Sequence, residues 1–363
     1  MNRQPDHRAT QHNLERDRAT WTEKKLKAGV VAQRLRAIGE IPRYLRMKDC
    51  TDTIISDVCE RCEARYVIQT NFCRDRLCPI CSWRRALRLT HRLGEIIETC
   101  QADKKAGKNE GETRPRYAHL TLTVRNVPWG ELAEQIKTIM KSWRRMEKRI
   151  KRAAAVLGWV RIFEVTRSHE HGNAHPHLHV LLQVPPEYFD QGSDLYLFHR
   201  KEALIRQWRE CLHVNYSPSI SINAVGDTDY EIERAIGEAT KYLLKDSGIE
   251  GLSDSDFKNY AEAVHGVRSW STSGRMRIND DEEIEAVLHD VPLYVKGTCR
   301  HCGGRMFEMR EVWTAAGKMY SVKVARDDAQ TGCSFTVNLN INNSGGGNVY
   351  VGDVYGGRAG GKE

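Results

Sequence analysis

The alternation of apolar and polar residues predicts three neighbouring strands in the middle of the chain. Over residues 119–125, leucine and valine alternate with threonine, which is the pattern of a strand with one buried face. Residues 159–166 form a second predicted strand, His-Gly-Asn at 171–173 a turn, and residues 175–184 the expected antiparallel partner. These segments therefore predict part of an antiparallel sheet.

Helices are predicted before and after these strands. In residues 131–156, apolar residues recur at helical spacing, and the opposite face carries a row of lysine and arginine. Such a row is most often a solvated face, with a contact to nucleic acid as the alternative. A basic helix is expected over 82–100, and further helices around 198–212 and 229–245. Periodicity alone thus predicts a mixed α+β protein.

Length and composition are those of an ordinary globular chain. The 363 residues are enough for two or three domains, and 40% of them are hydrophobic and 29% charged. The formal net charge of +8 favours a polyanionic partner such as DNA or RNA, although many unrelated enzymes share it. We find no run of about 18 apolar residues and no apolar segment of a signal peptide. We therefore expect a cytoplasmic protein without a membrane partner, whose eleven cysteines are reduced and bind metal.

Three histidines alternate along one predicted strand. His175, His177 and His179 stand in the sequence His-Pro-His-Leu-His-Val-Leu-Leu, and successive side chains of a strand point to opposite faces. The three imidazoles therefore share one face, while the apolar residues can anchor the strand in a core. Neutral imidazoles bind divalent metals, and such metals suit phosphate chemistry. A strand whose histidines lie on the surface is the alternative.

Two Cys-x2-Cys pairs predict a structural zinc site. Cys59 and Cys62 are separated from Cys78 and Cys81 by fifteen residues. This spacing fits four thiolates around a tetrahedral zinc ion with no open position. Such a site would organise a small region that otherwise lacks a core. Buried or redox-active cysteines are the alternative.

Other cysteines leave the set of zinc ligands open. Cys50 precedes the two pairs and Cys73 lies between them, so a different four of these six residues is an alternative set. A further pair, Cys299 and Cys302, has only Cys333 and nearby histidines to complete it. This pair amounts to half of a second zinc site.

A glutamate and a tyrosine are expected one helical turn apart in Glu-Ala-Thr-Lys-Tyr-Leu-Leu-Lys. Glu238 and Tyr242 share a helix face, with Lys241 and Lys245 close by. A phenol can attack a phosphodiester when a metal polarises the phosphorus and a carboxylate manages the proton or a water. Such a pair alone is more often structural, since the chain has thirteen tyrosines. The histidine strand elsewhere in the chain is what favours a catalytic interpretation of this pair.

Four segments, in the same order, resemble motifs of the plasmid rolling-circle replication initiators (Rep proteins) of the single-tyrosine HUH endonuclease family. The family's cysteine motif is similar to Phe-Cys-Arg-Asp-Arg-Leu-Cys-Pro-Ile-Cys-Ser-Trp-Arg-Arg at 72–85, and its first strand to 119–126. Its metal-binding motif is similar to Phe-Glu-Val-Thr-Arg at 163–167 followed by the histidines at 175–181. Its nucleophile motif is similar to residues 238–245. The resemblance covers about three-fifths of the chain.

The resemblance implies a fold and a metal centre. The fold is α+β, an antiparallel sheet flanked by helices with the ferredoxin- or RRM-like core of HUH endonucleases, and an N-terminal zinc-binding module. The resemblance makes His177 and His179 ligands of a catalytic Mg²⁺ or Mn²⁺ ion. Glu164 is the candidate third ligand, with His175 as the alternative.

The resemblance also implies a reaction. Tyr242 would attack the scissile phosphate at the plasmid origin, giving a 5′-phosphotyrosine and a 3′-hydroxyl primer. Glu238 would help a water or a DNA end complete termination, and Lys245, with Lys241 as a second candidate, would hold the phosphate. The implied partners are origin DNA, single-stranded or in a hairpin, and the host helicase and polymerase.

We expect four parts along the chain. These are a charged N-terminal arm (1–50), a cysteine-rich zinc module with a basic helix (51–115), the HUH nickase domain (116–280) and a C-terminal β-like region (281–363) with the second zinc pair and a glycine-rich tail. The function has two competitors. A single-tyrosine HUH transposase or relaxase typically lacks the cysteine stretch before the first strand. A non-catalytic, zinc-dependent DNA-binding replication regulator would leave the histidines without a role.

Overall fold

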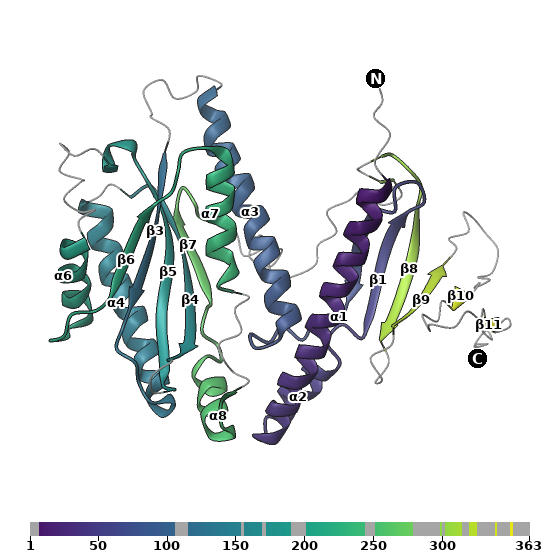
Figure 1. Ribbon diagram of the computed structural model, residues 1–363, viewed down its shortest axis with the longest axis horizontal. Helices are drawn as coiled ribbons and strands as arrows, with labels where there is room; N and C mark the ends of the chain where they lie inside the picture. Colours follow the sequence, from purple (N-terminus) through teal and green to yellow (C-terminus); the bar gives the residue numbers. More distant parts are fainter. Residues whose placement is uncertain are drawn as a thin grey trace, which may run out of the picture. The chain divides into compact units, whose positions relative to one another are not determined.

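The chain forms two compact units, each of which is discontinuous in sequence (Figure 1). The first contains Met1–Gln33, Ile41–Ile80 and Leu288–Glu363, and the second contains Arg34–Glu40 and Cys81–Val287. The first unit thus combines most of the expected N-terminal arm and cysteine-rich segment with the C-terminal region. The computed structural model describes residues 7–105, 115–153, 156–168, 172–189, 201–243, 251–278, 298–299, 302–313, 319–324, 338–339 and 349–350.

The second unit is built on a five-stranded antiparallel sheet. Its strands lie in the order β6-β3-β5-β4-β7. Their bounds are Arg116–Thr123 for β3, Gly158–Arg167 for β4, Ala174–Val184 for β5, Ile220–Ala224 for β6 and Trp270–Gly274 for β7. The three strands predicted from alternation are confirmed as β3, β4 and β5, and they occupy the centre of the sheet.

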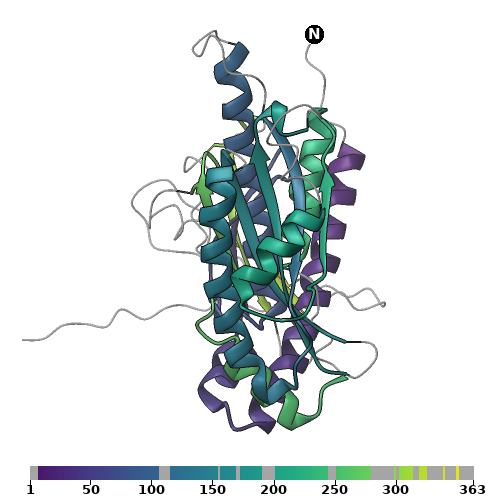
Figure 2. The ribbon, with the colours of Figure 1, turned by 90° about the vertical axis from the view of Figure 1, so that its left-hand side faces the viewer.

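Helices cover both faces of this sheet (Figures 1 and 2). One face is covered by α4 (Leu132–Ala153), against which α6 (Lys201–Leu212) and α8 (Asp254–Ala263) pack. The other is covered by α3 (Pro79–Lys105) and α7 (Asp229–Lys241). All of the helices predicted around the strands are therefore confirmed. Two short 3-10 helices, η1 (Trp129–Glu131) and η2 (Pro186–Phe189), precede α4 and follow β5.

Apolar side chains at helical spacing explain how these helices pack. Trp143 of α4 meets Trp159 of β4 edge to face, with 5.1 Å between the ring centroids. On the opposite face, Leu93 of α3 and Ile236 of α7 share a core with Leu181 of β5. Full burial of one such side chain contributes about 1.5–3 kcal/mol. The sheet is thus fixed on both sides, and its central strands are rigid supports for a site.

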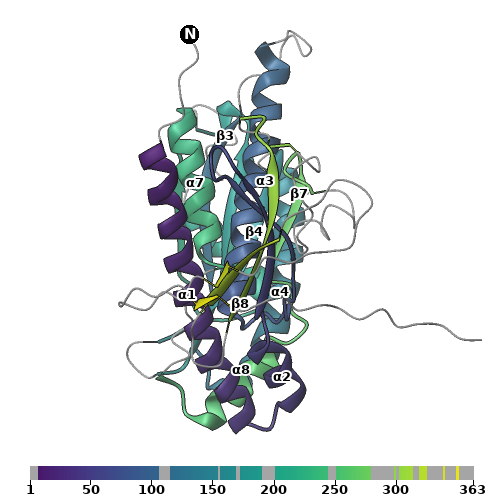
Figure 3. The same cartoon turned by 90° about the vertical axis from the view of Figure 1, so that its right-hand side faces the viewer.

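The first unit contains a second antiparallel sheet, in the order β2-β1-β8-β9. Its strand β8 is labelled in Figure 3. Its N-terminal helix α1 (His7–Ala37) is one long helix rather than the arm or short helices expected from the sequence. The C-terminal region is β-like, as predicted. The remaining elements are α2 (Ile41–Lys48), β1 (Thr53–Cys59), β2 (Arg65–Thr70), β8 (Met306–Trp313), β9 (Met319–Val324) and the short pair β10 (Asn338–Leu339) and β11 (Val349–Tyr350). None of the described helices is long and apolar enough to cross a membrane.

Candidate functional site

The two central strands bring Glu164, His177 and His179 together. The antiparallel register of β4 and β5 sets Glu164 directly opposite His177, so their side chains lie on the same face of the sheet. Oε2 of Glu164 lies 2.7 Å from Nε2 of His177 and 2.9 Å from Nε2 of His179. All three residues are buried, and one ligand atom from each lies within 4.8 Å of the others.

Neighbouring groups orient the two imidazoles. Nδ1 of His177 lies 3.0 Å from the carbonyl oxygen of His175 and donates there, which holds the ring with Nε2 directed toward Glu164. Oγ1 of Thr121, on β3, lies 3.4 Å from Nδ1 of His179. The short separations between Nε2 atoms and a carboxylate oxygen require a proton or a cation between them. This donor set fits a divalent cation with open positions for phosphate oxygens and water.

Geometry and electrostatics distinguish Glu164 from His175. Burial raises the pKa of Glu164, but hydrogen bonds from His177 and His179 outweigh it and lower this pKa to about 2. Glu164 is therefore ionised, as a metal ligand must be. His175 instead contacts the side-chain oxygen of Asn126 through Nδ1 and is not part of the converging group. Burial, together with His177, lowers the pKa of His175.

Helix α7 places a tyrosine over this group. It begins with a capping box in which Thr228 and Glu231 satisfy each other's backbone amides. Its apolar side, including Ile232 and Ile236, is buried against the sheet. The helix ends at Tyr242, which is its C-terminal capping residue. Burial of this face therefore fixes the position of the last turn of α7 and of its side chains.

The ring of Tyr242 stacks flat on the imidazole of His179. The ring centroids are 3.4 Å apart and the ring planes differ by 5°. Oη of Tyr242 donates to Oε1 of Glu238 over 3.3 Å, and Lys241 forms an ion pair with the same carboxylate. The predicted Glu–Tyr pair and the histidine strand therefore meet, although about 60 residues separate them in sequence. Lys245 lies outside the described residues.

The pKa values of this pair are shifted in opposite directions. Burial raises the pKa of Tyr242 to about 12, and the carboxylates of Glu238 and Glu164 act in the same direction. A hydrogen bond from Lys241 lowers the pKa of Glu238, despite some opposing desolvation. At neutral pH, Tyr242 is therefore a phenol and Glu238 a carboxylate that can accept its proton.

His119 is a further residue near the site that the sequence did not single out. It lies on β3 two residues before Thr121 and so on the same face of the sheet. Burial lowers the pKa of His119, while the charge of Glu238 and the backbone of Ala235 oppose this shift. The phase of His119 with the threonines of its strand was the one sequence signal that could have identified it.

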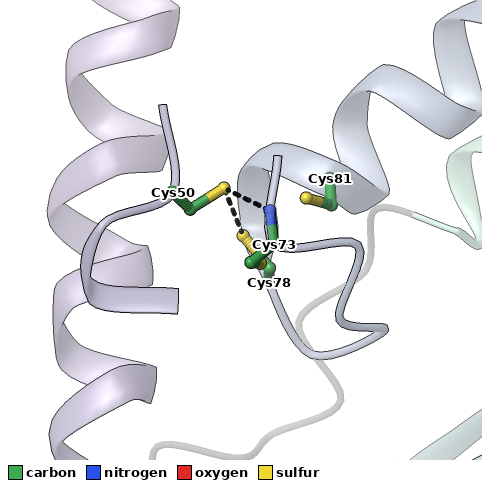
Figure 4. A group of neighbouring side chains, drawn as sticks. All are labelled: Cys50, Cys73, Cys78 and Cys81. Atoms are coloured by element: carbon green, nitrogen blue, oxygen red, sulfur yellow. Dashed lines mark hydrogen bonds between the residues drawn. The ribbon is translucent and has the colours of Figure 1, made fainter. Parts of the chain in front are cut away.

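One group of four cysteines surrounds the start of α3 (Figure 4). Cys50, Cys73, Cys78 and Cys81 offer sulfur atoms that all lie within 4.8 Å of one another. Sγ of Cys50 is 3.7 Å from Sγ of Cys78 and accepts a hydrogen bond from the amide of Cys73 over 3.4 Å. In a tetrahedral zinc site with Zn–S bonds of about 2.3 Å, sulfur atoms lie about 3.8 Å apart. This group therefore has the dimensions of a zinc site.

A second group contains Cys59, Cys62, Cys299 and Cys302. Sγ of Cys59 is 3.4 Å from Sγ of Cys302, and Sγ of Cys62 is 3.5 Å from Sγ of Cys299. All four sulfur atoms again lie within 4.8 Å of one another. The group joins residues that are 237 positions apart in sequence.

These two groups differ from the set of zinc ligands predicted from the sequence. The predicted set of Cys59, Cys62, Cys78 and Cys81 is divided, with one Cys-x2-Cys pair in each group. The physical reason is strand pairing, because β1 pairs with β8 and so brings the C-terminal cysteine pair to the end of β1. Cys78 and Cys81 lie instead with Cys50 and Cys73, the two residues named above as alternatives. Cys333 lies outside the described residues.

Comparisons with known proteins agree with the sequence motifs. The family model described as "Replication protein" matches residues 64–295, more than half of the chain. The chain is 32% identical over 226 residues to "Protein rep" of Streptococcus pneumoniae serotype 2, covering 62% of this chain and 67% of that protein. It is 30% identical over 279 residues to "Protein rep" of Lactiplantibacillus plantarum, covering 74% and 83%. For "Protein rep" of Staphylococcus aureus, the identity is 27% over 242 residues, covering 65% and 98%.

Among solved structures, none gives a significant match. The evidence for a family thus comes from the sequence, and the match extends over both the cysteine motif and the strands and helix that carry Glu164, the histidines and Tyr242. The chain therefore belongs to the replication protein family, whose members are the Rep proteins that initiate plasmid replication.

Proposed function

We propose that this protein initiates rolling-circle plasmid replication by nicking one strand of origin DNA, with Tyr242 as the nucleophile. The observation that carries the proposal is the stacking of Tyr242 on His179, which sets a candidate nucleophile against a candidate metal centre. A tyrosine that only packs in a core needs neither a carboxylate acceptor nor a neighbouring set of metal ligands. The sheet and its histidine pair support an HUH endonuclease fold of the ferredoxin- or RRM-like kind.

Glu164, His177 and His179 would hold Mg²⁺ or Mn²⁺. The ion, when bound, would supply electrophilic polarisation of the scissile phosphate. Imidazole ligands favour Mn²⁺ in vitro, whereas availability favours Mg²⁺ in the cell. The buried carboxylate supplies the negative charge of the site, and the backbone contact of His177 keeps its Nε2 directed toward the same point.

The first displacement uses the contact between Tyr242 and Glu238. As the bond from Oη to phosphorus forms, Glu238 takes up the phenolic proton along the hydrogen bond that it already accepts. The bond from phosphorus to the 3′-oxygen breaks, and this oxygen leaves as a hydroxyl after taking a proton from solvent. The 5′-phosphate stays on Tyr242, and the 3′-hydroxyl primes leading-strand synthesis.

Termination would reverse this attachment. Glu238, having lost its proton to solvent, would accept the proton of a water or a DNA hydroxyl as its oxygen attacks the phosphotyrosine. The bond from phosphorus to Oη would break, and Glu238 would return the proton to Oη. Lys241 lies beside Glu238 and is one candidate to hold the phosphate. Lys245 is the other candidate from the sequence.

The partners follow from the reaction. Origin DNA would enter as a single strand or a hairpin, since the scissile phosphate must reach a partly buried tyrosine, and the host helicase and polymerase would then extend the primer. We expect these events in the cytoplasm, where plasmid DNA lies. The group of Cys50, Cys73, Cys78 and Cys81 would hold structural zinc, because four thiolates leave no open position for catalysis.

The test is a covalent adduct between protein and DNA. Single-stranded origin oligonucleotides are incubated with the full chain and Mn²⁺ and resolved on a denaturing protein gel. Tyr242→Phe should abolish the adduct, whereas Tyr230→Phe, at a 73% exposed tyrosine of the same helix, should keep it. Chelation should also abolish it.

Two outcomes would overturn the proposal. An adduct that persists in Tyr242→Phe would assign the nucleophile elsewhere. The absence of any adduct with every divalent ion, while DNA binding is intact, would favour the non-catalytic DNA-binding regulator.

A further inference from the structure

Two short turns that carry cysteine pairs meet where β1 ends and β8 begins, and they have the same backbone hydrogen bonds. In both, the amide of the first cysteine donates to the carbonyl five residues later, and the amide four residues later donates back to the cysteine carbonyl. The bonds run from Cys59 N to Ala64 O, Glu63 N to Cys59 O, Cys299 N to Gly304 O and Gly303 N to Cys299 O, with lengths of 2.8–3.0 Å.

The turns also share an unusual bend. The residue four positions after the first cysteine is left-handed in each, with φ of 56° at Glu63 and 66° at Gly303. A glutamate rarely adopts this conformation, so the surrounding contacts must hold it there. The described residues of two segments far apart in sequence therefore share the same backbone hydrogen bonds and the same left-handed position.

The sulfur atoms of the two turns face one another. The contacts of 3.4 Å and 3.5 Å each join one turn to the other, from Cys59 to Cys302 and from Cys62 to Cys299. The amide of Arg61 donates to Sγ of Cys59 over 3.4 Å, a contact that stabilises a thiolate. The sulfurs thus already lie near the separation of about 3.8 Å that a tetrahedral zinc ion requires.

Other contacts fasten the turns around the sulfurs. The amide of Glu60 donates to the carbonyl of Arg305 over 3.0 Å, and Nη1 of Arg61 donates to the carbonyl of Cys302 over 3.2 Å. At Gly304, an added Cβ would lie 2.8 Å from Sγ of Cys59 and 3.2 Å from Sγ of Cys302. Only glycine leaves room there for both sulfur atoms.

We propose that Cys59, Cys62, Cys299 and Cys302 form a second structural zinc site, in which two matching turns clamp the C-terminal strands to β1. Half of its ligands precede the segment Cys81–Val287 in sequence and half follow it. The ion would therefore close the first unit at the point where its segments Ile41–Ile80 and Leu288–Glu363 meet. This inference does not depend on the nicking reaction.

Zinc counting tests which cysteines share an ion. Zinc released by a thiol-specific mercurial is measured on the full chain, so that an ion held by histidines is not counted. The wild type should release two zinc ions per chain. Cys59→Ser with Cys302→Ser, both in one site, should release one, whereas Cys59→Ser with Cys78→Ser, one in each site, should release none. Cys211→Ala, at a buried cysteine outside both groups, should release two.

Several results would overturn the proposal. A wild type that releases one zinc would refute two sites. A Cys59→Ser/Cys78→Ser protein that still releases one would place both cysteines in the same site. A second measurement needs no variant, in case the variants do not fold. Cys302 is partly exposed, so its rate of alkylation can be measured. Zinc-free protein is prepared by chelating the zinc that the mercurial releases and then removing the mercurial with excess thiol. Alkylation of Cys302 should be slow in the zinc-loaded wild type and at least tenfold faster in the zinc-free protein. Equal rates would refute zinc ligation by Cys302.

Discussion

Replacement of Glu164 by glutamine tests the metal centre with the least change of shape. The amide keeps the size of the buried carboxylate and can still contact both imidazoles, which lie 2.7 Å and 2.9 Å from Oε2. It removes the only negative charge among the three converging ligands. We therefore expect the fold to persist and the affinity for a divalent cation to fall.

The magnitude follows from the surroundings of the carboxylate. The decrease in the pKa of Glu164 from 4.5 to about 2 corresponds to about 3 kcal/mol in favour of the ionised form, at about 1.4 kcal/mol for each tenfold change in acidity. A site that favours the anion so strongly is arranged around its charge. Loss of a residue that merely supports a ligand costs about 10–100-fold in metal affinity. Loss of a charged ligand should cost at least about 100-fold, or about 2.7 kcal/mol.

The assay compares Mn²⁺ dependence in two ways. Nicking of an origin oligonucleotide is followed across Mn²⁺ concentrations, and free Mn²⁺ is measured by electron paramagnetic resonance in the presence of protein. Glu164→Gln should shift both titrations to higher Mn²⁺ by the same factor, and Glu262→Gln, at an exposed glutamate of α8, should leave them in place. Wild-type Mn²⁺ affinity in Glu164→Gln would refute the assignment of Glu164 as a ligand.

Three further predictions concern the proton acceptor, the second zinc site and chelation. Glu238→Gln should slow nicking by about 10²–10⁴-fold without weakening DNA binding, because the amide cannot take up the phenolic proton. Glu233→Gln, at an exposed position of the same helix, is the control. A nicking rate of Glu238→Gln within twofold of wild type would contradict this role of Glu238. Gly304→Ala should reduce the zinc released by the mercurial from two ions to one, because its Cβ would meet the sulfur atoms of Cys59 and Cys302. Gly94→Ala, with open space around it, should keep two ions. Two ions in Gly304→Ala would count against the second zinc site. Brief treatment with EDTA should abolish nicking, and Mn²⁺ should restore it while the thiolate-bound zinc stays in place; zinc loss in parallel with activity would show that the cysteine sites are not closed.

Local patterns along the chain were sufficient for the elements around the site. Strands β3, β4 and β5 and helix α4 were predicted because the spacing of apolar residues within one segment reports which side of that segment is buried. The shared face of His177 and His179 followed from the same rule, since alternation in a strand is a local property. The long α1 was not foreseen because its charged sequence has few apolar positions to reveal it.

Strand register shows which of two residues lies with the histidines at the candidate metal centre. Glu164 and His175 were both candidates for the third ligand, and nothing within either strand could choose between them. The pairing of β4 with β5 sets Glu164 opposite His177 and moves His175 to the end of the strand, opposite Thr166. The packing of α7 on the sheet then brought Tyr242 to His179, a contact that depends on the whole core.

The cysteines show most clearly where the sequence ceases to be sufficient. Two Cys-x2-Cys pairs fifteen residues apart have the spacing of one zinc site. Spacing limits the distance between two pairs, but it does not determine whether the folded chain places them side by side. The sequence by itself determined that the pairs are suited to bind metal and that the histidines lie in phase. Only the tertiary structure decided which pairs lie together. The pairing of β1 with β8 brings Cys62 close to Cys299, 237 positions away, and such long-range pairing has no local signature.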